Sequence, residues 1–409
     1  MDEGPFRTVP KTGVIFVMGE AARFGYTPEN RAWANLGQGA PETGPLPNSP
    51  QRLTEITCDL ATSEYSPVVG AYALRQAVAD LYNQRYRAGS ASLFTAENVA
   101  ISPGGRSALT RVAAALGRVN LGHFLPDYTA YEELLDLFRR FVPIPIALRR
   151  DAGFRIEVNE LEREINGRGL SALLISNPCN PTGQVIDGDE LRAWLDMCRQ
   201  TQCATIWDEF YAHYRYGDLK FDSAARYIED VDADQVVILD GLTKNWRYPG
   251  LRISWTLAPK QVIQRIASAG SFLDGGAPHP VQLAAIPLIE RSRADQEAHS
   301  IQAAFKKKRD YAVQRLTELG MRLVLPQGSF YVFADLSGLP EHLRDGLDFF
   351  RRGLEHQVIT VPGEFFDVNP GKRRRATSRL RHYVRISFGP SMDELKRGFE
   401  ALTRLVRSK

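Results

Sequence analysis

Short apolar runs alternate with longer amphipathic stretches through the middle of this 409-residue chain. We predict strands and intervening helices, the strands at 98–101, 123–125, 142–146, 172–176, 204–207 and 236–239, and the helices at such places as 106–117 and 189–199. Parallel strands need a crossover connection, which is usually an amphipathic helix. The alternation therefore predicts an α/β fold with a mostly parallel central sheet flanked by helices.

The pattern changes near residue 292, where a long amphipathic stretch begins. We predict helices at 295–319 and from Met392 onward, with strands between them at 323–325, 330–334, 358–361 and 383–388. Domains of roughly 100 to 200 residues are usual, so the length suits two or three of them. We expect a large domain at 51–291 and a smaller α+β domain at 292–409.

Composition excludes several classes of protein. Hydrophobic residues make up 44% of the chain, and 51 basic side chains nearly balance 48 acidic ones, which argues against disorder and against nucleic-acid binding. The longest apolar run near the amino terminus, 14–18, is far too short for a membrane span. Four scattered cysteines form no disulfide framework, and the seven histidines show no metal-ligand spacing. We expect a cytoplasmic protein with no metal, no membrane and no nucleic-acid partner.

The string Ser-Asn-Pro-Cys-Asn-Pro-Thr-Gly at 176–183 directly follows a predicted buried strand. Two Asn-Pro pairs and a glycine form a tight loop at the carboxyl end of that strand, where open α/β sheets bind ligands. The string resembles the Asn-Pro-x-Asn-Pro-Thr-Gly signature of the fold-type I pyridoxal phosphate enzymes, the aspartate aminotransferase superfamily. The resemblance extends from about residue 12 to residue 406. It implies a pyridoxal 5′-phosphate cofactor and the fold of that superfamily.

A lysine and an arginine follow the strand predicted at 236–239. The segment Gly-Leu-Thr-Lys at 241–244 is similar to the family's Ser-x-Ser-Lys, and Arg252 lies eight residues beyond the lysine. The resemblance implies that Lys244 forms the Schiff base with the cofactor and acts as general base. It also implies that Arg252 pairs with the cofactor phosphate.

A carboxylate beneath the cofactor's pyridine nitrogen keeps the ring electron-withdrawing. Asp208 ends the strand at 204–207 and begins a segment that resembles the family's Asp-x-x-Tyr, 28 residues after Asn180 and 36 before Lys244. The resemblance gives Asp208 the carboxylate role. It gives Tyr211 and Asn180 hydrogen bonds to the cofactor's phenolic oxygen, which lower the pKa of the Schiff base.

The stretch Ser-Pro-Gly-Gly-Arg-Ser at 102–107 joins a strand to a helix. Free N–H groups at a helix amino terminus favour an anion. The stretch resembles the family's phosphate loop, which implies that the backbone N–H groups of Gly105 and Arg106 bind the cofactor phosphate. The segment Leu-Pro-Asp-Tyr at 125–128 resembles the family's Pro-x-aromatic segment, so Tyr128 is expected to stack on the pyridine ring.

Three further segments complete the resemblance. The sequence Val-Arg-Ile-Ser at 384–387 matches the family's carboxylate clamp, which gives Arg385 that role. Residues 1–50 are expected to pack on the small domain and close the site, with Gly39 nearest to the substrate. The segment around Tyr65 resembles the one that reaches the phosphate of the neighbouring subunit, which implies a homodimer with shared active sites.

One position departs from the family pattern. Gly241 stands where the family has a serine whose hydroxyl usually contacts the phosphate. A hydrogen bond to a charged group is worth about 1.5–3 kcal/mol. We expect weaker cofactor binding unless Thr243, Arg106 or water takes the place of this hydroxyl.

The resulting hypothesis is an aminotransferase that moves an amino group between an L-amino acid and a 2-oxo acid. Arg106 stands where one subgroup has a lysine that pairs with the substrate's distal carboxylate, which favours glutamate or aspartate, although it could instead face the phosphate or solvent. The alternative is a specialised enzyme with the same site: a β-lyase, decarboxylase, cyclase or oxygen-using enzyme. A seven-residue basic excess at 372–385 indicates a solvated loop beside the site that steers anionic substrates.

Overall fold

The computed structural model of the protein describes residues 13–217 and 221–407. Its main feature is a seven-stranded sheet in the order β2-β8-β7-β6-β5-β3-β4. The strands are β2 Val99–Ser102, β3 Asn120–Leu125, β4 Val142–Ala147, β5 Ala172–Ser176, β6 Ala204–Asp208, β7 Val236–Gly241 and β8 Ser254–Leu257. All neighbouring pairs are parallel except those of β8, which runs antiparallel to both β2 and β7. The predicted mostly parallel sheet is confirmed.

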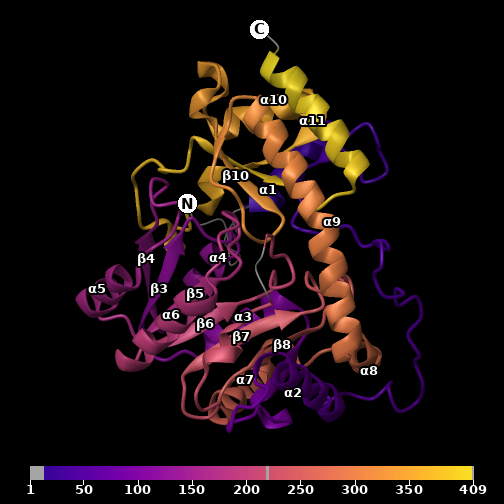
Figure 1. Ribbon diagram of the computed structural model, residues 1–409, viewed down its shortest axis with the longest axis vertical. Helices are drawn as coiled ribbons and strands as arrows, with labels where there is room; N and C mark the ends of the chain where they lie inside the picture. Colours follow the sequence, from indigo (N-terminus) through magenta and orange to yellow (C-terminus); the bar gives the residue numbers. More distant parts are fainter. Residues whose placement is uncertain (1–12, 218–220, 408–409) are drawn as a thin grey trace, which may run out of the picture.

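Helices cover both faces of this sheet (Figure 1). They are α2 Tyr72–Tyr86, α3 Gly105–Ala115, α4 Tyr131–Leu137, α5 Val158–Arg168, α6 Gly188–Gln200, α7 Lys260–Leu273 and α8 His279–Ala285. Strand β5 illustrates why both faces are covered. All five of its side chains are buried, and successive side chains in a strand point to opposite faces. Leu173 and Ile175 pack with α2, α5 and α6, whereas Leu174 packs with α3, α4 and α7.

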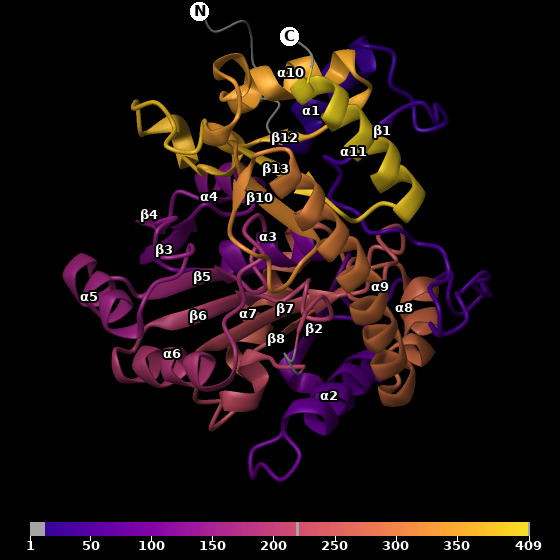
Figure 2. The ribbon, with the colours of Figure 1, turned by 45° about the horizontal axis from the view of Figure 1, so that its top comes forward.

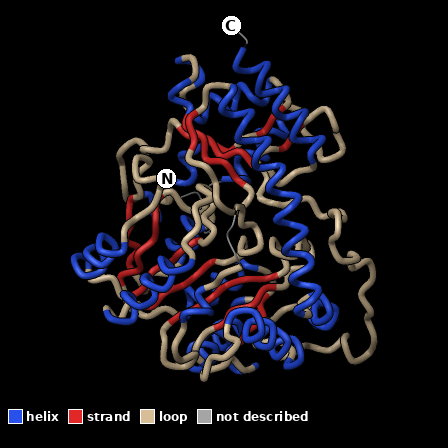
Figure 3. The backbone as a smooth tube through the Cα atoms, viewed as in Figure 1, coloured by secondary structure: helices blue, strands red, loops and turns tan. Residues whose placement is uncertain are grey.

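A second, smaller group of strands lies beyond the large sheet (Figure 3). It is a four-stranded sheet in the order β12-β13-β10-β9. The strands are β9 Arg322–Leu323, β10 Tyr331–Asp335, β12 Val361–Pro362 and β13 Tyr383–Ser387. Its helices are α9 Arg291–Glu318, which runs from one group of strands to the other in Figure 1, α10 Gly346–Glu355 and α11 Met392–Arg407. This α+β unit corresponds to the one predicted from residue 292 onward.

The amino-terminal segment lies among these carboxyl-terminal elements, as the indigo ribbon shows in Figure 2. Helix α1 Gly13–Arg23 leads to β1 Ala34–Asn35, which pairs in parallel with β11 Val358–Ile359. The prediction of one strand at 358–361 was therefore wrong. Val358–Ile359 pairs with β1, and Val361–Pro362 joins the four-stranded sheet through β13.

The parallel strands place their carboxyl ends along one edge of the large sheet. Strands β3, β5, β6 and β7 end at Leu125, Ser176, Asp208 and Gly241, and the predicted site residues Tyr128, Asn180, Tyr211 and Lys244 follow three or four residues later. Such an edge is the usual ligand site of an open α/β sheet. Among the described helices, none combines the length and the apolarity that a membrane crossing requires.

Candidate active site

A cavity of about 420 Å³ opens at this edge of the sheet. Nine of the residues predicted from the sequence line it: Gly105, Arg106, Tyr128, Asn180, Asp208, Tyr211, Thr243, Lys244 and Arg252. They come from five separate segments of the chain, which the fold brings together around one cavity. Leu109, Ser176, Phe210 and Pro249 complete the wall.

Lys244 carries the reactive amine of the cavity. Burial lowers the pKa of Lys244 to about 7, and three nearby guanidinium groups act in the same direction, those of Arg385, Arg106 and Arg252. Asp208 opposes them. The Nζ atom donates a hydrogen bond to the carbonyl oxygen of Gly39. Because only a neutral amine is a nucleophile or a base, this environment prepares Lys244 for both roles near neutral pH.

Asp208 lies at the end of β6 and is buried. Its Oδ2 atom accepts a hydrogen bond of 2.7 Å from the hydroxyl of Tyr131, and the backbone N–H of Phe210 donates to Oδ1 at 3.4 Å. Burial raises the pKa of Asp208 to about 6, while the Tyr131 hydroxyl and Lys244 favour the ionised form. A buried carboxyl that is mostly ionised near neutral pH would suit the protonated ring nitrogen of a bound cofactor.

The start of α3 forms one end of the cavity. Gly104 has a φ of +90°, and a Cβ there would overlap the guanidinium of Arg252. A Cβ at Gly105 would overlap the ring of Phe210. Both glycines are therefore required by close approach. Their absent side chains leave the free N–H groups of the helix beside the Arg252 cation, an arrangement that binds anions.

Positions 243 and 241 differ in whether they supply a hydroxyl to a ligand. The Oγ1 atom of Thr243 is buried and has no hydrogen-bond partner among the described residues, so it is available to a ligand. A Cβ at Gly241 would lie 2.6 Å from the carbonyl oxygen of Ile253 and 2.6 Å from the Cα of Ser254. The close pairing of β7 with β8 thus explains why no serine stands at position 241.

Arg385 approaches the cavity from β13 of the smaller sheet. Its Nη1 donates to Asn180 Oδ1 at 3.1 Å, and its Nη2 donates to the carbonyl oxygen of Gly37 at 2.7 Å. The side chain is buried, and its Nε has no partner among the described residues. A buried guanidinium with donors held beside Lys244 is suited to a carboxylate. Gly37 and Gly39 place the 34–40 segment against the same space.

Two predicted residues lie toward the outside. Arg106 is exposed, and its Nη2 lies 3.5 Å from the hydroxyl of Tyr128. Tyr65 is 99% exposed and lines a separate surface depression with His279 rather than the active-site cavity. The structure therefore does not bring Tyr65 to the site within one chain.

Sequence reasoning missed three aromatic residues of the site. Tyr131 contacts Asp208, Phe210 packs on Gly105, and Tyr331 lies 3.0 Å from Tyr211, hydroxyl to hydroxyl. Tyr131 could have been considered, because it begins α4 only three residues after Tyr128. No local pattern identifies Tyr331, which comes from the other sheet.

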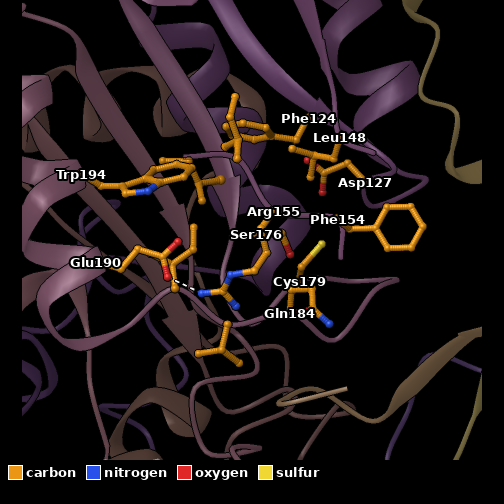
Figure 4. Close-up of a pocket in the computed structure, with 14 residues that line it drawn as sticks. Phe124, Asp127, Leu148, Phe154, Arg155, Ser176, Cys179, Gln184, Glu190 and Trp194 are labelled. Atoms are coloured by element: carbon orange, nitrogen blue, oxygen red, sulfur yellow. Dashed lines mark hydrogen bonds and ion pairs between the residues drawn. The ribbon is translucent and has the colours of Figure 1, made fainter. Parts of the chain in front are cut away.

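A second, much smaller cavity of about 50 Å³ lies behind the 177–180 loop (Figure 4). Its walls are mostly apolar, with an ion pair between Arg155 and Glu190 at one side. Asp127 also lines it, and burial raises the pKa of this carboxyl well above its usual range. Ser176 borders both cavities. At this size the cavity has room for about three water molecules.

Three of the seven residues in the basic stretch predicted to steer substrates line another groove, of about 760 Å³: Lys372, Arg374 and Arg379. Lys372 pairs there with Glu132, and Arg374 pairs with Asp367 at 2.7 Å. These ion pairs neutralise part of the excess charge. Among the described residues, no group of three or more His, Cys, Asp or Glu side chains could hold a metal ion.

A family model described as aminotransferase class I and II matches residues 31–402. The chain belongs to this family. Its members are fold-type I enzymes that depend on pyridoxal 5′-phosphate, and the protein is an aminotransferase with this cofactor. The predicted family, fold and cofactor are thereby confirmed.

Aminotransferase relatives resemble the chain over most of its length. A probable aspartate/prephenate aminotransferase of Aquifex aeolicus is 26% identical over 84% of this chain and 84% of its own. An aspartate aminotransferase of Sulfurisphaera tokodaii is 26% identical over 91% of this chain and 89% of its own. The solved structure of Thermus thermophilus aspartate aminotransferase with maleate shares the fold, with a TM-score of 0.79 at 22% identity, covering 98% of this chain and 100% of that one.

The described residues fit the aminotransferase cofactor on three counts. The glycines of the α3 start leave an anion cradle, Thr243 lines the same cavity with an unpartnered buried hydroxyl, and Lys244 offers an amine of which about half is neutral near pH 7. The carboxyl of Asp208 lines the same cavity and completes the set. Phosphate, aldehyde and pyridine nitrogen thus each have a chemically matched group in one cavity.

Proposed function

We propose that this aminotransferase attaches its cofactor to Lys244 and clamps the substrate's α-carboxylate with Arg385. The supporting observation is the buried amine of Lys244, which lies in one cavity with Asp208 and whose pKa the guanidinium of Arg385 helps to lower. Thr243, Arg252 and the backbone at Gly105 and Arg106 would hold the phosphate, with Tyr128 against the ring. Tyr211 and Asn180 would hydrogen-bond the phenolic oxygen.

The residues then divide the work of amino transfer. When bound, pyridoxal phosphate supplies a ring that withdraws electrons from the substrate's α-carbon. Asp208, as a carboxylate, holds a proton on the ring nitrogen. Arg385 would hold the substrate's carboxylate and so limit how the substrate is oriented toward Lys244. The neutral Nζ of Lys244 removes that proton and later returns one, which is why its pKa near neutrality matters.

We further propose that glutamate or aspartate is one of the amino donors. Arg106 supports this proposal, because its exposed guanidinium lines the cavity and its contact there is the hydroxyl of Tyr128 at 3.5 Å rather than a carboxylate. A second carboxylate of the substrate could therefore pair with Arg106 at the expense of no more than this long contact with Tyr128. The Arg106→Ala variant should lose activity toward glutamate more than toward alanine. Arg118→Ala, an exposed arginine outside the cavity, is the matched control.

The test is a panel of amino acids mixed with the purified holoenzyme. Conversion of the cofactor's visible absorption, with a 2-oxo acid as the product by mass spectrometry, is the expected result. Release of carbon dioxide or ammonia, with no formation of pyridoxamine phosphate, would instead favour a specialised lyase or decarboxylase. Equal losses of activity toward glutamate and alanine in Arg106→Ala would contradict the dicarboxylate proposal alone.

We also propose a cytoplasmic homodimer whose domains are 51–291 and 292–409, with 1–50 closing the site; residues 1–12 lie outside the described residues. The 99% exposure of Tyr65 supports shared sites, because a side chain so free of its own subunit can reach a neighbouring one. The four free cysteines suit a reducing compartment. Mixing Lys244→Ala subunits with Tyr65→Ala subunits should restore activity if the sites are shared, and should restore none if each chain acts alone.

A further inference from the structure

Tyr331 brings a second hydroxyl into the active site from the smaller sheet. It is the first residue of β10 and is fully buried. Its hydroxyl oxygen lies 3.0 Å from that of Tyr211, and the two rings meet edge to face at 5.7 Å. A Cβ added at Gly39 would lie 3.4 Å from the Tyr331 hydroxyl. The contact therefore joins the two sheets beside the segment that contacts Lys244.

The direction of this hydrogen bond follows from counting hydrogens. A tyrosine hydroxyl has one hydrogen to donate. In the proposed function Tyr211 gives its hydrogen to the cofactor's phenolic oxygen. Its own oxygen can then only accept, so the hydrogen between the two tyrosines must come from Tyr331. Burial favours the neutral hydroxyl in both residues, raising the pKa of Tyr331 to about 12 and that of Tyr211 well above its usual range.

We propose that Tyr331 is a positioning residue that donates to Tyr211 and thereby holds the Tyr211 hydroxyl toward the phenolic oxygen of the cofactor. This inference rests on the proposed function. A hydroxyl that accepts one hydrogen bond becomes a stronger donor in the next, because chains of hydrogen bonds polarise one another. Tyr331 should therefore help to lower the pKa of the nitrogen that links Lys244 to the cofactor.

The ring of Tyr331 has a second, separable contact. The guanidinium carbon of Arg385 lies 4.1 Å from the centre of this ring, and 5.1 Å from that of Phe366. An aromatic face attracts a cation at this distance. The ring thus orients the carboxylate clamp, whereas the hydroxyl acts on Tyr211. One side chain can therefore be dissected by two substitutions.

Other charges around Lys244 and Tyr211 stay in place when Tyr331 is changed. They come from several elements: Arg385 on β13, Arg106 on α3, Arg252 before β8, Asp208 on β6 and the phenol of Tyr128 after β3. Tyr331→Phe removes none of them. A shift in this variant would thus report the lost hydroxyl.

The experiment is a pH titration of the cofactor's visible absorption in the holoenzyme. We expect the midpoint of Tyr331→Phe to rise by about half to one pH unit, the size of one neutral hydrogen bond. Tyr211→Phe should move the midpoint further in the same direction. The double variant should match Tyr211→Phe, because Tyr331 acts through Tyr211. A Tyr331→Phe midpoint equal to that of the wild type, or additive shifts in the double variant, would overturn the proposal.

Two further measurements separate the hydroxyl from the ring and from general damage. Tyr331→Leu should also raise KM for the amino acid severalfold, whereas Tyr331→Phe should leave KM near the wild-type value. Tyr216→Phe is the control, since this buried tyrosine donates at 2.6 Å to the carbonyl oxygen of Ser329 and does not line the cavity. It should leave the midpoint unchanged.

A variant that does not fold leaves the proposal open to a second test. The more acidic 3-fluorotyrosine, incorporated at position 331, keeps the hydroxyl and should lower the midpoint; an unchanged midpoint would contradict the proposal. Failure of the proposed function has a different signature. In that case Tyr211→Phe and Lys244→Ala would both leave the absorption of the bound cofactor unaltered.

Discussion

Restoring the family's serine at position 241 should damage this enzyme. The motif alone favours Gly241→Ser as a gain, because the new hydroxyl could reach the phosphate. The structure predicts a loss, because Gly241 pairs with Ser254 across β7 and β8 and a Cβ would lie 2.6 Å from two backbone atoms. Backbone atoms cannot rotate away, so the two strands would have to separate.

Overpacking of this kind costs about 1–3 kcal/mol. For a chain of 409 residues, at about 2.1 cal/mol/K of unfolding entropy per residue, that cost corresponds to a Tm about 1–4 °C lower. Thr243 and Arg252 flank the displaced strands, so the affinity for pyridoxal phosphate should fall as well. Differential scanning fluorimetry of the apoenzyme and a cofactor titration measure the two effects. Gly117→Ser, where a Cβ meets nothing within 4 Å, is the matched control. A Gly241→Ser variant with wild-type Tm and tighter cofactor binding would contradict the steric clash inferred at position 241.

Three other outcomes follow from the site. The rate at which the apoenzyme captures pyridoxal phosphate should rise with pH to a midpoint near 7, since burial lowers the pKa of Lys244 to about 7 and only the neutral amine reacts; a midpoint near 10 would contradict this. Tyr131→Phe should lower kcat/KM by about 10- to 150-fold, the value of one hydrogen bond to the charged Asp208, and an unchanged kcat/KM would exclude its support of the carboxylate. Arg385→Lys should raise KM for the amino acid by a similar factor without a comparable fall in kcat, because lysine cannot make the bidentate contact.

Much of the large sheet could be predicted from local pattern. The run at 172–176 is apolar throughout and became β5 with the predicted bounds, because a strand buried on both faces needs no alternation. The position of Asp208 at the end of β6 followed in the same way. These features depend on residues that are neighbours in sequence.

The features that were missed depend on pairing between distant segments. Val358–Ile359 forms a strand separate from Val361–Pro362 because it pairs with the amino-terminal strand β1. The sequence of the 358–361 run does not indicate this pairing. The contact between Tyr331 and Tyr211 likewise exists only once two sheets have packed together. Motifs located the chemistry, whereas tertiary packing determined which aromatic side chains surround it.

Attachment of the cofactor to Lys244 can be tested by chemical trapping. Borohydride reduction of the holoenzyme fixes the cofactor covalently to the amine that holds it, and mass spectrometry of the digested protein then locates the modified residue. We expect the pyridoxyl group on the peptide that contains Lys244. Modification of another lysine, with Lys244 unmodified, would contradict it.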